Sequence, residues 1–496
     1  MTRSRYTLSR WDASAASAAR RVARARGGGP WLGAGVVSGV ALLAWPYTVD
    51  DAFIVARYAR NIASGGGYGM NAGTRSDGVT GPLWLVPQLI AVRAGLEPVL
   101  IAKLLGALCV ATAIWLLLRD LAVRTLGSRA LAPAVALIAL SPSLGTAGVS
   151  GLETGAATLL LTIAALAATR RPRADAWTLG ACVAALAWLR PELALACGVL
   201  LASAALRDRR AGAIAGALAL AGAAALLAWR WMLFDDWLPL SARAKAGPLA
   251  HGARYTLTGV VLATSLVGAW LAYLGARHGR RRERVFAAAI AAHLCAVVLA
   301  GGDWMPGYRL LVPVLPLYAW LAAWGLVRAF ARRRRLGLSC LVLALLVPAA
   351  DLLTRVPELH AAGASQRAAA SLAARLREQA SVVALVDVGY LAYASDVEVV
   401  DLGGLTDAVI ARSRGGHLDK RVESAYLERR NPDALLLHAA EPPRVDGEGR
   451  LLALAGYPVE RRIAALPFVR ARFRVAHVQR YAPGYYYVLL TAHGGT

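Results

Sequence analysis

Residues 99–118 read VLIAKLLGALCVATAIWLLL, and the next stretch, residues 119–129, reads RDLAVRTLGSR. A run of about 20 apolar residues is the length that a helix needs to cross a bilayer. Arg119, Arg124 and Arg129 follow it directly, where a polar loop begins. This succession of apolar run and arginine-rich loop predicts a membrane-spanning helix, and much of the remaining chain repeats it.

The composition of the 496-residue chain is typical of a membrane protein. Hydrophobic residues make up 57% of it and charged residues only 17%, yet 55 Lys and Arg face 30 Asp and Glu. So large an excess of cations among so few charges must be concentrated in short loops, as in multi-span proteins with basic cytoplasmic loops. The arginines interrupt apolar runs and form no basic surface interleaved with aromatic residues. The composition therefore excludes a plain soluble enzyme and disfavours nucleic acid as a partner.

The apolar runs predict about eleven transmembrane helices. These candidate spans lie near 31–49, 99–118, 130–149, 155–169, 174–189, 193–206, 211–233, 255–275, 285–300, 309–331 and 336–353. Arginine-rich stretches separate them at 119–129, 170–173, 207–210, 277–284 and 332–335. All of these stretches are cytoplasmic if the N-terminus is, as the positive-inside rule requires.

One apolar segment, Pro82–Leu96, breaks this topology if it is counted as a span. It is short and contains Pro87, Gln88 and Arg93. We therefore expect a helix that lies at the outer interface of the membrane. The residues expected to face lipid are Leu85, Val86, Leu89, Val92 and Leu96.

The chain divides by character into three parts. Residues 1–30 hold seven arginines and predict a basic cytoplasmic tail, and residues 31–354 form a membrane domain whose first outer loop covers 50–96. Residues 355–496 carry charges throughout, with strand-like runs such as Val382–Val386. Such runs, bounded by turn residues, predict a C-terminal α/β domain, which the topology places outside the cytoplasm. The fold class predicted is a polytopic α-helical membrane protein with an extracytoplasmic α/β domain.

Unusual polar residues collect at the predicted outer ends of the spans. Acids and bases at membrane boundaries must be paired or hydrated, so such a cluster predicts a water-filled cavity on that side. The candidate cavity residues are Asn71, Asp77, Thr80, Glu153, Arg190, Glu192, Asp236, Lys245, Asp303 and Arg309. Each also has a plainer reading: a helix cap, a turn, an Arg190–Glu192 ion pair, or headgroup contact for Lys245 and Arg309.

Asp50 and Asp51 end the first apolar run, where an isolated charge is costly. A general base needs such a position, partly desolvated yet within reach of an acceptor hydroxyl. The competing interpretation is a helix cap followed by a solvated surface helix. Lys245 and Arg309, cations on the side that the positive-inside rule disfavours, suggest an anionic ligand such as a lipid phosphate.

These motifs resemble those of the GT-C superfamily of membrane glycosyltransferases. The first outer loop reads DDAFIVARYARN from Asp50 to Asn61, then NAG from Asn71 and DGVTGPLW from Asp77 to Trp84. Later motifs follow in the same order as in that superfamily. They are SGLET around Glu153, LRPE around Arg190, LP at 238–239 with AK at 244–245, GGDWMPGYR ending at Arg309, and VDLGGLTD at 400–407. The closest resemblance is to the terminal arabinofuranosyltransferase family of mycobacterial cell walls, although Asp77 replaces a usual Glu and LSAR precedes Lys245 atypically.

The resemblance implies an inverting enzyme that takes a sugar, such as arabinofuranose, from a polyprenyl-phosphate donor at the outer face of the inner membrane. The acceptor would be a cell-envelope glycan or lipid. One residue of the pair Asp50 and Asp51 would be the catalytic base. Donor phosphate and sugar would be bound by Arg57, Arg60, Lys245, Asp303 and Arg309.

Three alternatives remain at this stage. A protein O-glycosyltransferase of the same fold differs only in its acceptor. A lipid or sugar transporter would carry ionisable groups near the membrane midplane within inverted repeats, and the sequence shows neither. A divalent cation is an optional cofactor, because an outer cavity rich in aspartate offers the oxygen ligands that Mg²⁺ prefers.

Overall fold

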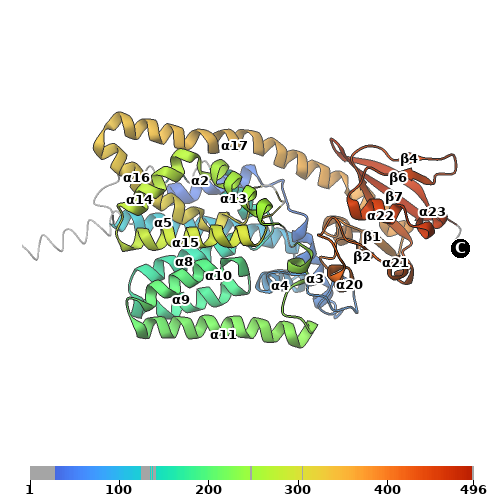
Figure 1. The fold of residues 1–496 in the computed structure, drawn as a ribbon, viewed down its shortest axis with the longest axis horizontal. Coiled ribbons are helices and arrows are strands. Elements are labelled where there is room, and N and C mark those ends of the chain that lie inside the picture. Colours follow the sequence, from blue (N-terminus) through green and yellow to red (C-terminus); the bar gives the residue numbers. More distant parts are fainter. Residues whose placement is uncertain are drawn as a thin grey trace, which may run out of the picture.

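The computed structural model describes residues 28–124, 135, 137, 141–245, 248–303, 305 and 307–493. A bundle of long helices makes up most of it, and a domain built on a β-sheet lies at one end of the bundle (Figure 1). Most of the predicted basic tail and the first half of the predicted span 130–149 fall outside the described residues.

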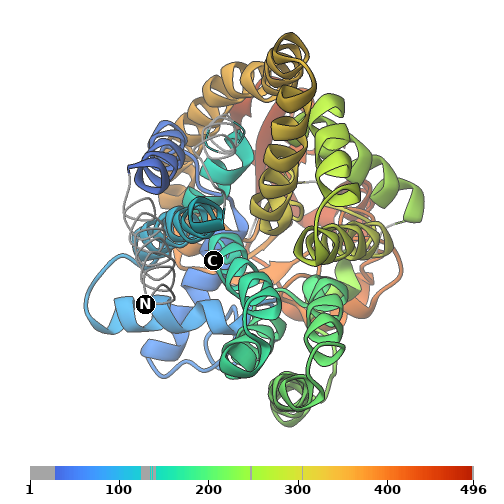
Figure 2. The same cartoon turned by 90° about the vertical axis from the view of Figure 1, so that its left-hand side faces the viewer.

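The bundle forms because apolar faces of its helices pack around one large core. Ile114, Leu161, Leu186, Leu200 and Leu326 come from five different helices and are all buried in that core. The helices run roughly along one direction, so that Figure 2 shows many of them end-on. The helical elements of this part of the chain are α2 (Gly29–Leu43), α3 (Asp51–Ala63), η1 (Pro82–Trp84), α4 (Leu85–Arg93), α5 (Pro98–Arg124), α7 (Pro142–Val149), α8 (Thr154–Thr169), α9 (Pro172–Ala187), η2 (Pro191–Leu193), α10 (Ala194–Ala205), α11 (Arg209–Phe234), α12 (Leu240–Ala244), α13 (Leu249–Thr264), α14 (Leu266–Arg277), α15 (Arg281–Leu299), η3 (Val312–Val314), α16 (Leu315–Arg332) and α17 (Arg334–Ala368).

Several of these helices are long and apolar enough to cross a membrane. The described part of the chain contains 4 such helices: Pro98–Val123, Arg209–Phe234, Val312–Arg332 and Arg334–Gln379. Two pairs meet the same criterion together but are bent, α7 with α8 by 117° and α13 with α14 by 89°. The chain is therefore a helical membrane protein, and the number of spans expected from the sequence, about eleven, is not confirmed.

The segment Pro82–Leu96 forms η1 and the 9-residue helix α4, which is too short to cross a bilayer. Val86 and Leu96 are exposed, as expected of residues that face lipid, and Leu89 and Val92 are partly buried. The expectation for Leu85 is wrong, because this side chain is buried against Tyr58 and Trp84 of the outer loop. Ile90 is exposed in its place.

Helix α17 connects the bundle to the sheet domain as one 35-residue helix. It starts at the end of the bundle far from the sheet and runs along its length (Figure 1). The division expected between residues 354 and 355 falls inside this helix. The connection between the two parts is thus a continuous helix and not a loop.

The C-terminal part is a mixed α/β domain, as its strand-like runs predict. Its five-stranded sheet has the order β2-β1-β3-β7-β6, with β1 parallel to β2 and β3, and β7 antiparallel to β3 and β6. Strands β4 and β5 form a separate antiparallel pair. The elements are α18 (Ala370–Gln379), β1 (Val382–Leu385), α19 (Tyr390–Ser395), β2 (Glu398–Asp401), α20 (Ala408–Arg412), α21 (Ser424–Arg430), β3 (Ala434–Ala439), β4 (Arg444–Val445), β5 (Leu451–Ala453), α22 (Pro458–Ala464), α23 (Pro467–Arg472), β6 (Phe473–Ala482) and β7 (Tyr485–Ala492).

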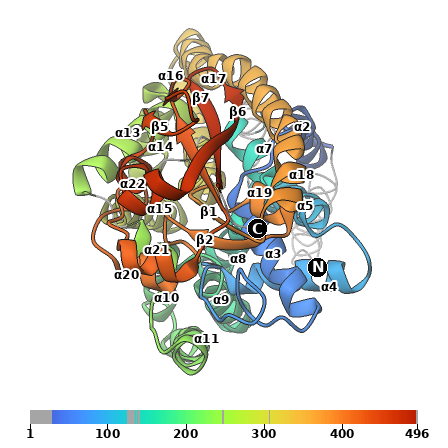
Figure 3. The ribbon, with the colours of Figure 1, turned by 90° about the vertical axis from the view of Figure 1, so that its right-hand side faces the viewer.

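The sheet contacts the bundle at the carboxyl ends of its parallel strands β1 and β2. After β1 the chain reaches Gly389, whose backbone N–H donates to Asp50. After β2 it reaches Leu405, which lines a cavity of the bundle. Figure 3 shows the sheet domain in front of the bundle. Where the two parts meet, α19 contacts α3 and α20 contacts α12. The domain thus covers the loops of the bundle that hold the candidate site.

Candidate active site

A cavity of about 720 Å³ lies in the bundle close to the sheet domain. Its lining divides into a polar part and an apolar part. Of the residues predicted from the sequence, those that line it are Asp51, Thr80, Glu153, Arg190, Glu192, Lys245, Asp303 and Arg309. Side chains that are far apart in the chain are therefore brought together as the topology argument predicts.

Asp51 faces two cations in this cavity. It begins α3, and its Oδ2 is 3.1 Å from Nζ of Lys245 at the end of α12. The same oxygen is 3.7 Å from Nη2 of Arg309, which lies in the loop before η3. Three separate segments thus contribute one carboxylate and two cations, and about a fifth of each side chain is exposed, at 20%, 23% and 18%.

The two cations decide the protonation state of Asp51. Burial favours the neutral carboxylic acid. The positive charges of Lys245 and Arg309 outweigh this effect and hold the pKa of Asp51 below its usual value. The carboxylate is therefore ionised at neutral pH, which is the form that accepts a proton.

Asp303 enters the cavity from a turn that only glycine can form easily. Gly301 and Gly302, at the end of α15, both have positive φ angles, 82° and 74°. A Cβ on Gly302 would also lie 2.8 Å from Cβ of Tyr255. After this turn, Asp303 accepts a hydrogen bond from Nε of Arg309 at 2.5 Å. Arg309 is thereby held from one side by Asp303 while its Nη2 faces Asp51.

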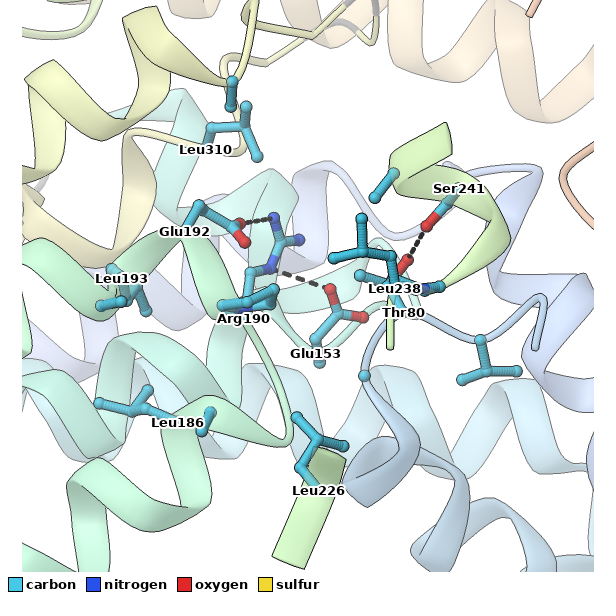
Figure 4. Close-up of a pocket in the computed structure, with 18 of the residues that line it drawn as sticks. Thr80, Glu153, Leu186, Arg190, Glu192, Leu193, Leu226, Leu238, Ser241 and Leu310 are labelled. Atoms are coloured by element: carbon cyan, nitrogen blue, oxygen red, sulfur yellow. Dashed lines mark hydrogen bonds and ion pairs between the residues drawn. The ribbon is translucent and has the colours of Figure 1, made fainter. Parts of the chain in front are cut away.

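Arg190 is part of a second charged group in the cavity lining. It lies between Glu153 and Glu192, at 2.9 Å and 3.0 Å, and Figure 4 shows the guanidinium between the two carboxylates. It also donates to the Thr154 hydroxyl at 2.6 Å. The predicted Arg190–Glu192 ion pair is therefore present, and Glu153 completes it. These groups offer fixed donors and acceptors to a ligand that bears hydroxyl groups.

The apolar part of the cavity is a groove between α9, α10 and α11. Its walls carry small and branched apolar side chains that leave room for a hydrocarbon chain. They are Val183, Leu186, Ala187, Leu193, Ala194, Cys197, Gly198, Leu201, Ala219, Ala223, Leu226 and Leu227. A single cavity thus joins a charged end to a hydrophobic groove.

Two residues of the cavity were missed in the sequence. Arg230 in α11 is buried and lines the cavity. It donates hydrogen bonds to Asp77 at 2.9 Å and to the Thr80 carbonyl at 3.1 Å. Ser241 in α12 pairs with the Thr80 hydroxyl at 2.7 Å, as Figure 4 shows. An arginine inside an apolar run was a usable signal, because such a charge needs a partner. Nothing in the sequence distinguishes Ser241.

Asp50 faces away from the cavity, toward the sheet domain. Its carboxylate accepts hydrogen bonds from the backbone N–H groups of Gly389 at 3.0 Å and Tyr390 at 2.8 Å, at the start of α19. This close approach requires glycine, because a Cβ at position 389 would overlap the Asp50 carboxylate. Burial and the nearby charge of Asp387 raise the pKa of Asp50, against the effect of these hydrogen bonds.

Arg57 and Arg60 also contact α19 and do not line the cavity. Arg57 donates to the carbonyls of Ala392 at 2.8 Å and Val397 at 3.0 Å. Arg60 donates to the Tyr393 carbonyl at 3.0 Å. With Asp50 at the start of α19 and the two arginines near its end, α3 places charges that complement the dipole of α19. We call these three residues the α19 clamp.

Asn71, Asp77 and Asp236 lie outside the cavity lining as well. The Asn71 amide donates to the Val399 carbonyl at 2.8 Å and accepts from its N–H at 2.9 Å, as a neighbouring strand would. Asp77 is held by Arg230, as described above. Asp236 pairs with Arg243 at 2.6 Å and with Arg412 of α20 at 3.2 Å. These residues stabilise the outer loops and their contact with the sheet domain.

The carboxylates do not converge in the way that a divalent cation requires. Asp50 faces α19, Asp51 faces Lys245, and Asp303 faces Arg309. Among the described residues, no group of three or more His, Cys, Asp or Glu side chains is arranged to hold a metal ion.

The helical bundle with a sheet domain at one end is a fold that solved structures share. Two crystal structures of ArnT from Cupriavidus metallidurans are similar to this chain, one bound to undecaprenyl phosphate and one in the apo state. Their TM-scores are 0.57 and 0.55, with 13% sequence identity in both cases. The similarity covers 92% of this chain and 97% and 96% of theirs. It shows a shared fold and does not support the narrower resemblance to the arabinofuranosyltransferases.

Two further comparisons concern the sequence. Residues 357–488, most of the sheet domain, match the family described as "Domain of unknown function (DUF8728)". Comparison with curated proteins gives no match.

Proposed function

We propose that this protein is an inverting membrane glycosyltransferase. It transfers a sugar from a polyprenyl-phosphate donor to a cell-envelope glycan or lipid at the outer face of the inner membrane. The observation that carries the proposal is the joining, in one cavity, of an apolar groove to a carboxylate flanked by Lys245 and Arg309. The ArnT-like fold supports it, since one ArnT structure is bound to undecaprenyl phosphate.

The apolar groove would hold the first isoprene units of the donor. Each buried CH₂ contributes about 0.8 kcal/mol, so that even a short stretch of chain anchors the lipid. Lys245 and Arg309 line the same cavity as the groove, and the donor phosphate would lie against them. Arginine and lysine bind phosphate oxygens through charge-assisted hydrogen bonds.

Asp51 would act as the general base. It would take the proton of the acceptor hydroxyl as the oxygen attacks the anomeric carbon and the bond from that carbon to the phosphate oxygen breaks. The leaving polyprenyl phosphate keeps the electron pair of that bond, and Lys245 and Arg309 would stabilise its additional negative charge. Attack from the side opposite the leaving group inverts the anomeric centre.

The remaining polar groups would orient the sugar and the acceptor. Glu153 and Glu192 are fixed by Arg190, and Thr80 is fixed by Ser241. Such pre-oriented groups bind sugar hydroxyls at low entropic cost. Arg57 and Arg60 have no part in this proposal, because the α19 clamp engages both of them.

The test is sugar transfer by the purified full-length protein in lipid nanodiscs. Radiolabelled polyprenyl-phosphate donors carrying arabinofuranose or hexoses are offered together with acceptor glycans and lipids extracted from bacterial envelopes. We expect one sugar to be transferred by the wild type, with transfer lost in Asp51→Asn and preserved in Arg60→Ala as the matched control. Equal transfer by the wild type and Asp51→Asn would exclude Asp51 as the base.

A further inference from the structure

The two cations assigned to the donor phosphate are already engaged by an anion of the protein. Nζ of Lys245 and Nη2 of Arg309 both face the same oxygen, Oδ2 of Asp51. In the described part of the chain, Asp51 is the carboxylate that Lys245 contacts. A phosphate that enters this position therefore meets cations whose charge is partly neutralised.

The geometry allows Arg309 to change partner without moving far. Its Nε stays hydrogen-bonded to Asp303, while only Nη2 is directed at Asp51, at the longer distance of 3.7 Å. Lys245 follows directly after α12, whose Ser241 is anchored to Thr80. Both cations thus have supports that do not depend on Asp51.

We propose that Asp51 occupies the phosphate position in the unliganded protein and is displaced when the donor phosphate binds. This inference rests on the proposed function and adds to it that the donor itself releases the catalytic base. The phosphate takes over Lys245 and Arg309, and the carboxylate of Asp51 then lies beside an anion instead of two cations. A carboxylate in that setting is a stronger base.

The exchange gives the reaction an order. Before the donor binds, the cations stabilise the ionised carboxylate and make Asp51 a weak base. After the donor binds, Asp51 has a higher affinity for the proton of the acceptor hydroxyl, and the cations lie at the leaving oxygen. The base is therefore strengthened only when a donor is present to react.

The exchange also predicts that removing the catalytic base strengthens binding of the lipid phosphate. When a competing state occupies the site most of the time, the apparent affinity falls by the fraction of time the site is free. With the ion pair formed about nine-tenths of the time, its removal raises affinity about tenfold. A role for Asp51 in chemistry alone predicts no such gain.

The test is binding of undecaprenyl phosphate to the full-length protein, measured by native mass spectrometry and by the shift in thermal unfolding. Asp51→Asn is expected to bind about tenfold more tightly than the wild type. Glu192→Gln is the matched control, because it removes one carboxylate of the cavity while Arg190 keeps Glu153. A gain in Asp51→Asn no larger than that in Glu192→Gln, or weaker binding, would overturn the inference.

A double-mutant cycle separates release of a cation from general loss of negative charge. Lys245→Gln should weaken binding, and the gain from Asp51→Asn should shrink at least severalfold in the Lys245→Gln background, because the freed cation is absent. Additive effects of the two substitutions would count against the exchange. Asp51→Glu, which keeps the charge, guards against a folding artefact and should keep affinity near that of the wild type.

The two proposals fail in different ways. If Asp51→Asn loses transfer but gains no affinity, the glycosyltransferase function stands and the exchange is wrong. If Asp51→Asn gains affinity but the wild type transfers no sugar from any polyprenyl-phosphate donor, the exchange stands and the assigned reaction is wrong.

Discussion

The two faces of α3 carry similar charged side chains but contact different parts of the molecule. On one face, Asp51 lies in the cavity between Lys245 and Arg309. On the other, Asp50, Arg57 and Arg60 hold α19 of the sheet domain. Neighbouring positions at a helix start point about 100° apart, so that two adjacent aspartates reach different surroundings. The pKa of Asp51 is lowered by two cations, whereas burial and Asp387 raise that of Asp50.

This comparison separates chemistry from docking within one motif. The resemblance to GT-C enzymes assigns the pair Asp50 and Asp51 to catalysis without choosing between them. The cavity lining includes Asp51 and leaves out Asp50. A residue that anchors the helix carrying the proposed base would affect the reaction through the position of Asp51 and not by accepting a proton.

The largest expected effect is the difference between Asp51→Asn and Asp50→Asn in sugar transfer. Loss of a general base lowers the rate by about 10²–10⁴-fold. Asn at position 50 still accepts one hydrogen bond from α19, so that its loss should stay within about tenfold and appear as weaker docking. Transfer rates and thermal unfolding of both variants are the measurements. Equal losses of transfer would mean that both aspartates act in the chemistry.

The next effect tests the α19 clamp at its most buried residue. The Arg57 side chain is 5% exposed and donates to carbonyls of Met70, Ala392 and Val397. Arg57→Ala leaves these carbonyls without their donor and should cost about 3 kcal/mol. We expect the loss as faster hydrogen exchange in residues 389–397, with the cavity's affinity for undecaprenyl phosphate little changed.

Arg60→Ala is the matched control for that prediction. Arg60 gives one hydrogen bond to the Tyr393 carbonyl and lies over the Tyr393 ring at 3.5 Å. Its removal should cost only about 0.5–1 kcal/mol, because the side chain is partly exposed. If Arg57→Ala and Arg60→Ala loosened α19 equally, the clamp would not depend on the buried arginine.

Much of this arrangement follows from the sequence, and the limits have physical causes. Apolar run length and arginine position suffice to predict a helical membrane protein with a cavity on one side. They also predict that Asp51, Lys245 and Arg309 lie on the side of that cavity, because Asp51 and Arg309 are at span ends and Lys245 is in a loop on that side. The partners of Arg57 and Asn71 in the sheet domain could not be predicted, because they lie more than 320 residues away and the docking of that domain depends on tertiary packing.

A third prediction concerns pH and a buried cluster of the sheet domain. His438 lies between Glu460, at 2.6 Å from its Nδ1, and Asp387, at 3.0 Å from its Nε2. Burial alone would lower the pKa of His438, but these two acids raise it to about 10. The group therefore stabilises the fold fully below its unfolded pKa of about 6.5, and this contribution is lost as the pH rises to about 10.

Thermal unfolding of the wild type and His438→Gln between these pH values is the measurement. The wild type should lose more stability than the variant across the window, by about 1–3 kcal/mol. The charge of Asp387 also raises the pKa of Asp50, which accepts hydrogen bonds from α19. Loss of the positive charge of His438 is therefore expected to loosen the α19 clamp and to leave the ion pairs of Asp51 in place. Parallel curves for the two proteins would show that His438 is not charged in the folded state.

The last prediction sharpens the comparison at the edge strand β2. Asn71 forms two hydrogen bonds with Val399 of β2, so that the outer loop takes the place of a strand neighbour. Asn71→Ala should cost about 1–2 kcal/mol, since each neutral hydrogen bond contributes about 1 kcal/mol. Asn71→Asp keeps the acceptor and loses the donor, which leaves the Val399 N–H protected and its carbonyl unpaired. Faster exchange of that N–H in Asn71→Ala, and not in Asn71→Asp, would show that this loop residue docks the sheet domain; unchanged exchange in both would restrict docking to α3.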